Sequence, residues 1–78
     1  MVANMEEILD LIREERRKQD EKWGGKNFLN DYSAMTILTE EIGEVAHAIL
    51  EKDFKNMEEE LVQVAAVCVK WLESIRGV

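Results

Sequence analysis

The sequence of 78 residues has no proline, one histidine and a single cysteine, Cys68. A single cysteine excludes a disulfide framework within the chain and a zinc site of the Cys/His type. The absence of proline leaves helices free to run long without a break. No apolar stretch approaches the roughly 20 residues of a membrane span, and the N-terminus does not resemble a signal peptide. We therefore expect a cytoplasmic protein without a membrane partner.

Basic residues are also in deficit, because 10 Lys and Arg stand against 17 Asp and Glu and give a formal charge of −7. Binding to a nucleic-acid backbone depends on neutralising phosphates with Lys and Arg, so nucleic acid is not expected as a partner. The basic residues at positions 13–18 are interleaved with acidic ones and predict a solvated, salt-bridged helix face. Contact with phosphate groups is the alternative for this cluster.

A chain of this length is expected to form one domain, residues 1–78, with little core. Folding buries only about 60–65% of the surface that so short an unfolded chain exposes. Oligomerisation is a common way for small domains to gain the missing stability.

The first helix is expected over residues 4–22. Asn4 is suited to cap its N-terminus, with Glu7 three residues on as the capping-box partner. The apolar residues of this segment end at Ile12, so its second half is either exposed to solvent or borders a polar cavity. Two adjacent glycines, Gly24 and Gly25, end the helix and open a loop that runs to about residue 32.

Two further helices are expected to follow as an antiparallel hairpin. The second helix begins at an Asp31 or Ser33 cap and ends near residue 51. The turn falls around Lys52-Asp53, and Asp53 or Asn56 caps a third helix that extends to about residue 75.

Each helix of the hairpin carries an apolar stripe at helical spacing. The stripe of the second helix consists of Leu38, Ile42, Val45 and Ile49. The stripe of the third helix consists of Met57, Leu61, Val64, Cys68, Trp71 and Ile75. We expect the stripes to form the core, and the third helix, which has a second apolar face, to be buried on several sides. Since three helices leave a bundle incomplete, we predict an all-α, three-helix protomer whose helical hairpin completes a bundle by oligomerisation.

Acid and amide side chains mirror each other about the predicted turn. Glu41 and Glu44 lie three residues apart on the second helix, and Glu60 and Gln63 lie three apart on the third. In a hairpin folded at residue 52, Glu44 lies opposite Glu60 and Glu41 opposite Gln63, and residues three apart share a helix face. Carboxylates gathered in this way repel each other unless a cation lies among them. A hard divalent cation such as Mg²⁺ takes carboxylate oxygens and keeps positions open for phosphate.

The alternative interpretation is ordinary helix surface, where glutamate is common because it favours helices. The mirrored spacing favours a divalent-metal site at the edge of the buried face. Glu40 lies one step further round the second helix, beside Glu44, and is a candidate for orienting a ligand or for acting as a base.

These residues also carry a family resemblance. The pattern Glu40-Glu41-x-x-Glu44 followed by Glu60-x-x-Gln63 resembles the Glu-Glu-x-x-Glu … Glu-x-x-Asp signature of the MazG-like, all-α nucleoside triphosphate pyrophosphohydrolases. It is most similar to the short, single-module members. The resemblance implies oligomers built from helical bundles, use of Mg²⁺ or Mn²⁺, and hydrolysis of a nucleoside triphosphate to the monophosphate and pyrophosphate. Carried over by position, Glu41, Glu44 and Glu60 match the metal-binding carboxylates of the family.

The chain departs from this signature at Gln63, where the family usually has aspartate. A glutamine oxygen can bind a hard cation but brings no negative charge. The resemblance therefore implies a site with Gln63 as an uncharged fourth metal ligand, which holds Mg²⁺ less tightly or needs the substrate's phosphates to complete it. A catalytically weakened, nucleotide-binding variant is the alternative.

Further residues are predicted to act in such a site. Glu40 or Glu44 is the expected general base. The expected substrate contacts are Lys22, Trp23, Lys26, Asn27 and Lys70. Trp23 is suited to stack on a nucleobase, with a lid over the core as the alternative. Lys70, which the hairpin points towards residue 34, is a candidate for a phosphate or base contact, with a solvated lysine as the alternative.

The sequence therefore predicts a Mg²⁺-dependent pyrophosphohydrolase that converts an NTP or dNTP, standard or modified, to the monophosphate and pyrophosphate. Its expected role is nucleotide-pool housecleaning, and its expected partners are the nucleotide and further copies of itself, as a homodimer or homotetramer. The competing class is a non-enzymatic helical interaction module, whose apolar faces would bind a partner protein.

Overall fold

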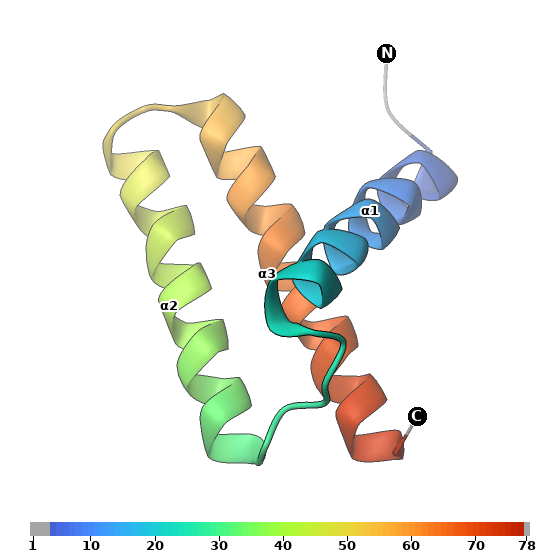
Figure 1. The fold of residues 1–78 in the computed structure, drawn as a ribbon. Helices are drawn as coiled ribbons and strands as arrows, with labels where there is room; N and C mark the ends of the chain where they lie inside the picture. Colours follow the sequence, from blue (N-terminus) through green and yellow to red (C-terminus); the bar gives the residue numbers. More distant parts are fainter. Residues whose placement is uncertain (1–3, 78) are drawn as a thin grey trace.

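The computed structural model describes residues 4–77, which form three α-helices (Figure 1). These are α1 (Met5–Trp23), α2 (Asp31–Leu50) and α3 (Phe54–Arg76). The helices α2 and α3 form an antiparallel hairpin, and α1 crosses α3 at an angle and packs against it (Figure 1). The all-α fold class with three helices is thereby confirmed. No helix in residues 4–77 combines the length and the apolarity that crossing a membrane requires.

The ends of α1 follow the prediction. The Asn4 side chain accepts a hydrogen bond from the Glu7 backbone N–H at 2.9 Å, which satisfies one of the free donors at the helix start. At the other end Gly24 adopts φ 72°, and its N–H donates to the carbonyl of Asp20. That left-handed backbone conformation is open to glycine without strain, so the helix ends where the glycine pair begins.

The cap of α2 differs from the prediction. Asn30 caps the helix, and its side-chain oxygen accepts from the Ser33 N–H at 2.9 Å. The predicted caps Asp31 and Ser33 are wrong, because both lie inside the first turn. The Asp31 carboxylate instead accepts from the Trp71 Nε1–H at 2.8 Å, a contact between α2 and α3 that local sequence does not reveal.

The turn between α2 and α3 is short and lies where it was predicted. Lys52 takes φ 57°, and the Asp53 N–H donates to the Ala48 carbonyl at 2.9 Å. Asp53 also caps α3, because its side chain accepts from the Asn56 N–H at 3.1 Å. This turn, which the hydrogen bond between Asp53 and Ala48 closes, fixes the register of the hairpin. It therefore decides which residues of α2 and α3 face each other.

The interior of the protomer overlaps the predicted core stripes only in part. Its fully buried apolar residues are small: Ala34, Ala48, Ala66 and Val67. The predicted core stripes are partly outside, because Ile42, Leu61 and Ile75 are 52%, 54% and 64% exposed. Trp71 and Met57, expected in the core, are only half-buried.

The physical reason is that each helix of the hairpin has two adjacent faces that could be buried against another helix. Small side chains on one face let the two helices approach closely, and that face is therefore buried within the protomer. The same face carries Glu41 and Glu60, which are partly buried. Glu41 and Glu60 are thus partly buried in the contact of the two helices while Glu44 is exposed, which agrees with the predicted place at the edge of the buried face.

Candidate functional site

Three glutamates converge between α2 and α3. One carboxylate oxygen each from Glu41, Glu44 and Glu60 lies within 4.8 Å of the other two. Glu41 and Glu44 are three residues apart on α2, and the closed turn brings Glu60 of α3 opposite them. The mirrored spacing in the sequence predicted this convergence. We call these three residues the carboxylate cluster.

The carboxylate cluster has no ion-pair partner among the described residues. Within residues 4–77, no Lys, Arg or His forms an ion pair with any of its three members. Burial, followed by the hydrogen bond and charge of Glu44 and then by Glu41, raises the pKa of Glu60 to about 7. Burial and the charge of Glu44 also raise the pKa of Glu41, although the Lys22 ammonium opposes this.

The donor set fits a hard divalent cation. Carboxylate oxygens are the ligands that Mg²⁺ and Mn²⁺ prefer, whereas softer metals select thiolate or imidazole. A cation bound among these oxygens would remove the repulsion that raises the pKa of Glu60. Glu44 is exposed, so the cluster opens to solvent on one side and can be reached by a ligand.

Gln63 reaches the cluster from the position predicted, but with its nitrogen. In the orientation in which both amide atoms find complementary partners, the Gln63 nitrogen donates to Glu41 Oε2 at 2.9 Å and to Glu60 Oε2 at 3.3 Å. The side chain is half-buried and joins a carboxylate of α2 to one of α3. The sequence analysis predicted Gln63 as a metal ligand through its oxygen, and that role stays a prediction.

Glu40 lies outside the cluster but next to it. It is exposed and lines an open cleft of about 480 Å³ together with Glu44 and Glu60. The cleft is also lined by Gly43, His47 and Asn56. Glu40 is therefore within reach of a ligand held at Glu44, as its predicted role requires.

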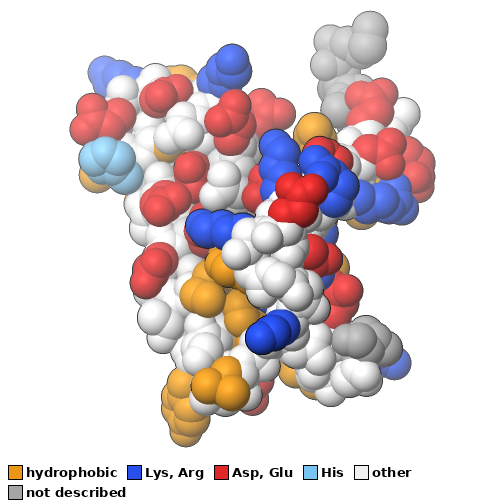
Figure 2. All heavy atoms as spheres, viewed as in Figure 1, with side chains coloured by type: hydrophobic (Ala, Val, Ile, Leu, Met, Phe, Trp, Pro, Cys, Tyr) orange, Lys and Arg blue, Asp and Glu red, His pale blue; other side chains and the backbone are white. Residues whose placement is uncertain are grey.

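A second, smaller cleft lies on the other side of the cluster, towards α1. It has a volume of about 90 Å³, and its lining consists of Glu15, Lys18, Gln19, Lys22 and Trp23 of α1 together with Glu41 and Gln63. The polar second half of α1 therefore borders a polar cavity, which was one of its two predicted settings. Figure 2 shows red acidic side chains along the hairpin and blue basic ones where α1 crosses it.

Lys18 is a cleft residue that sequence analysis did not select. The basic cluster at 13–18 was interpreted as one solvated, salt-bridged face, but the structure divides it. Arg13 and Arg17 pair with acids of their own helix, whereas Lys18 makes no ion pair within residues 4–77. The signal was present in the spacing, since Lys18 precedes Lys22 by four residues and shares its helix face.

Trp23 packs on the interior and lines a cleft, and its stacking on a nucleobase stays a prediction. Its ring is tilted by 52° against that of Phe28, with the centroids 6.1 Å apart, so it covers part of the interior. It also lines the smaller cleft. The ammonium groups of Lys22 and Lys70 lie 5.6 and 5.8 Å from the centre of the ring, a distance at which the ring attracts cations.

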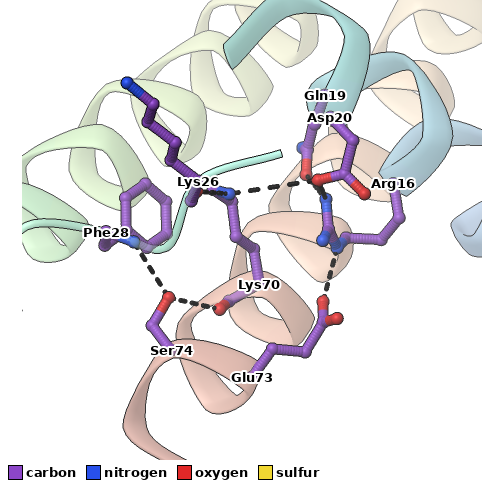
Figure 3. A network of polar contacts seen from close by, with 8 residues as sticks. All are labelled: Arg16, Gln19, Asp20, Lys26, Phe28, Lys70, Glu73 and Ser74. Atoms are coloured by element: carbon purple, nitrogen blue, oxygen red, sulfur yellow. Dashed lines mark hydrogen bonds and ion pairs between the residues drawn. The ribbon is translucent and has the colours of Figure 1, made fainter. Parts of the chain in front are cut away.

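Lys70 is buried under the loop between α1 and α2, and the predicted alternative of a solvated lysine is wrong. The residue is 3% exposed, and its ammonium donates to the backbone carbonyl of Lys26 (Figure 3). It lies 4.0 Å from the Asp20 carboxylate and 5.2 Å from the centre of the Phe28 ring. In this position Lys70 holds the loop, and it lines neither cleft beside the carboxylate cluster.

Further polar contacts complete this junction (Figure 3). Ser74 accepts from the Phe28 N–H at 3.0 Å and donates to the Lys70 carbonyl at 2.9 Å. Arg16 pairs with Glu73 at 2.8 Å and with Asp20 at 2.9 Å. We call this set of contacts around Lys70 and Arg16 the loop junction.

Lys26 and Asn27 lie in the loop and are exposed. The Lys26 side chain points away from the loop junction (Figure 3), and neither residue lines the two clefts beside the cluster. Their contacts with substrate stay predictions, as does a direct contact by Lys70.

Comparison with known proteins gives one match. A family model described as the MazG nucleotide pyrophosphohydrolase domain matches residues 30–73. The matched segment contains α2, most of α3, the whole carboxylate cluster and Gln63. No curated protein and no solved structure matches the chain.

Proposed function

The chain belongs to the MazG nucleotide pyrophosphohydrolase family, and on this premise we propose that it converts an NTP or dNTP, standard or modified, to the monophosphate and pyrophosphate. The observation that carries the proposal is the carboxylate cluster, whose three acids lie within 4.8 Å of one another without an ion-pair partner among residues 4–77. Such a concentration of charge is unfavourable for the fold alone and favourable for a ligand of opposite charge.

Mg²⁺, or Mn²⁺ in its place, is the cofactor that the donor set fits. Glu41, Glu44 and Glu60 are its proposed ligands. A bound divalent cation neutralises phosphate charge and lowers the pKa of an attacking water. The metal and the nucleotide are expected to bind together, because the phosphates supply oxygens that the protein does not.

The reaction requires water to attack the α-phosphorus. A bond forms between the water oxygen and that phosphorus, the bond to the bridging α–β oxygen breaks, and pyrophosphate leaves with the bonding electrons. The proton of the water passes to a carboxylate, for which Glu44 and Glu40 are the candidates. Both are exposed beside the open cleft, where a water has access.

The α1 side of the cluster is suited to the rest of the nucleotide. Lys18 and Lys22 line the smaller cleft next to Glu41, and ammonium groups there would attract the triphosphate. Trp23 forms one wall of the cleft and offers an aromatic surface to a base. The loop junction acts indirectly, by fixing the loop that follows Trp23.

The protomer alone does not enclose a nucleotide. The cleft beside Glu40 holds about 480 Å³ but is open to solvent, and the smaller cleft has about 90 Å³, whereas pockets for small ligands hold about 300–1,000 Å³ and cover most of the ligand. The predicted core stripes, with Ile42 and Leu61 about half exposed, provide an apolar surface beside the site. We therefore assign the completion of both the bundle and the pocket to a second copy of the chain, in a homodimer or homotetramer.

The substitution Leu61→Glu tests this assembly, because it places a charge in the proposed contact between copies. Light scattering coupled to size-exclusion chromatography should report an oligomer for the wild type and a lower mass for the variant. The matched control is Leu29→Glu, since Leu29 is 89% exposed in the loop. A wild type that is monomeric throughout the tested concentrations would contradict the assembly.

A nucleotide-binding variant with weakened catalysis is the second candidate. It is favoured by Gln63, which gives this chain one carboxylate fewer than the family signature. The two candidates share the site and differ in turnover.

The deciding experiment is product analysis by ion-exchange chromatography. The protein is incubated with each common ribo- and deoxyribonucleoside triphosphate in Mg²⁺ and in Mn²⁺, beside the variants Glu44→Gln and Glu51→Gln. We expect monophosphate and pyrophosphate from the wild type and from Glu51→Gln, whose exposed side chain lies outside the cluster. Glu44→Gln should lose at least about 100-fold in rate. Release of orthophosphate and a diphosphate would show a different reaction and overturn the proposal.

A further inference from the structure

We propose that Gln63 is a positioning residue, which holds Glu41 and Glu60 together through its amide nitrogen and does not bind the metal through its oxygen. The inference rests on the proposed function, because it concerns how the candidate metal site is kept assembled. It departs from the role that the family signature gives to the residue at this position.

The geometry of the amide carries the inference. A side-chain amide nitrogen has two protons, and in the orientation that gives both amide atoms complementary partners the Gln63 nitrogen lies 2.9 Å from a Glu41 oxygen and 3.3 Å from a Glu60 oxygen. Glu41 belongs to α2 and Glu60 to α3, so the nitrogen bridges the two helices at the level of the site. With this orientation the amide oxygen faces donor groups and not the carboxylates.

An aspartate at position 63 could not act in this way. An ionised carboxylate only accepts hydrogen bonds, and its charge would add to the repulsion among Glu41, Glu44 and Glu60. The amide has the opposite effect, because its two N–H dipoles point at the buried carboxylates. Gln63 therefore lets the cluster stay assembled before a cation arrives.

A fourth carboxylate would both bind the metal and affect the spacing of the other carboxylates, whereas in this proposal different residues have these two roles. Glu41, Glu44 and Glu60 would hold the metal, and the spacing between Glu41 and Glu60 would be set by an uncharged group that need not move when the metal binds. The expected site is more rigid and less negative than a four-carboxylate site. A ligand role for the Gln63 oxygen would instead require the amide to turn over and release both carboxylates.

The first test observes the amide directly. The chain has only two glutamines, Gln19 and Gln63, so ¹⁵N labelling of glutamine side chains gives two NH₂ signals, which the variant Gln63→Met assigns. We expect the Gln63 protons to exchange with water at least about ten-fold more slowly than those of free glutamine. The slow exchange should persist when Mg²⁺ is added. Loss of protection on adding Mg²⁺ would show that the oxygen has turned to the metal and would overturn the proposal.

The second test compares thermal unfolding in EDTA. Gln63→Met keeps the volume but removes the donors, and Gln63→Glu keeps the shape but turns the donor into an acceptor. Without metal we expect both to unfold below the wild type, Gln63→Met by about 4–8 °C and Gln63→Glu by more. A ligand role predicts no loss for Gln63→Met in EDTA, since the oxygen then has no metal to bind, and that result would overturn the proposal.

The same samples separate failure of this inference from failure of the proposed function. Mg²⁺ with a non-hydrolysable triphosphate analogue should raise the unfolding temperature of the wild type. If this shift is present while Gln63→Met is as stable as the wild type in EDTA, only the positioning role fails. If the shift is absent, the metal site itself fails, whatever Gln63 does.

Discussion

The loop junction and the carboxylate cluster both include side chains of α3, and both contain charged groups that are partly buried. At the loop junction each charge has a partner: Lys70 donates to the loop backbone beside Asp20, and Arg16 lies between Asp20 and Glu73. At the carboxylate cluster three acids meet with only the uncharged Gln63 between them. Compensated charges stabilise the fold, whereas uncompensated ones indicate where a ligand binds.

The contrast between the two regions predicts that the removal of one charge changes the stability of the protein in opposite directions. At the loop junction a lost charge leaves its partner without a contact and should destabilise the protein. In the carboxylate cluster a lost charge relieves repulsion and should stabilise the protein in the absence of metal, while it abolishes the function of the site.

The largest expected effect on stability belongs to Lys70→Met. Methionine keeps the apolar stem but removes the ammonium, so the Lys26 carbonyl loses its donor and the loop its anchor. We expect the free energy of unfolding to fall by about 1–3 kcal/mol, measured by chemical denaturation. Lys52→Met is the matched control, since Lys52 is exposed in the turn and should change stability little. An unchanged stability for Lys70→Met would mean that the loop junction is not compensated as described.

A smaller change in stability, in the opposite direction, is expected for Glu60→Gln. The substitution keeps the shape and removes one charge from the cluster. In EDTA the variant should be more stable than the wild type by up to about 1 kcal/mol, as is common where a functional site carries strain. It should also lose pyrophosphohydrolase activity. A variant that is less stable than the wild type in EDTA would show that Glu60 serves the fold.

The smallest effect is a dependence on pH. Because the pKa of Glu60 rises from 4.5 to about 7 on folding, the folded chain binds more protons than the unfolded chain between these values. The contribution of Glu60 to the free energy of unfolding is therefore present below about pH 4.5 and is lost as the pH rises towards 7. The stability advantage of Glu60→Gln in EDTA should grow over the same interval, and denaturation at several pH values measures it. A stability advantage of Glu60→Gln that shrinks with rising pH would contradict the raised pKa of Glu60.

Much of this molecule was predictable because its signals are local or periodic. Asn4 and Asp53 are caps followed by helical patterns, and the glycine pair after Trp23 ends α1. The carboxylate cluster was predictable for a further reason. Its residues repeat at a spacing of three on two helices joined by one short turn, so the hairpin alone brings them together.

The features that were missed depend on contacts between distant segments. Periodicity shows that α2 and α3 each have two adjacent faces that could be buried. It does not show that the face with the small residues Ala34 and Ala48 is the one buried within the protomer. The burial of Lys70 depends on a backbone carbonyl in the loop, which no side-chain pattern records. The orientation of the Gln63 amide depends on its neighbours on two helices, which the residue type alone does not show, and its role as a metal ligand stays a prediction.

The most direct test of the contrast between the two regions is thermal unfolding with Mg²⁺ and a non-hydrolysable nucleoside triphosphate analogue. The wild type, Glu60→Gln and Lys70→Met are compared with and without both ligands. We predict a rise in unfolding temperature for the wild type and for Lys70→Met, and none for Glu60→Gln. A wild type that is indifferent to Mg²⁺ and nucleotide together, or a Glu60→Gln variant that responds as the wild type does, would contradict the assignment of the carboxylate cluster as the ligand site.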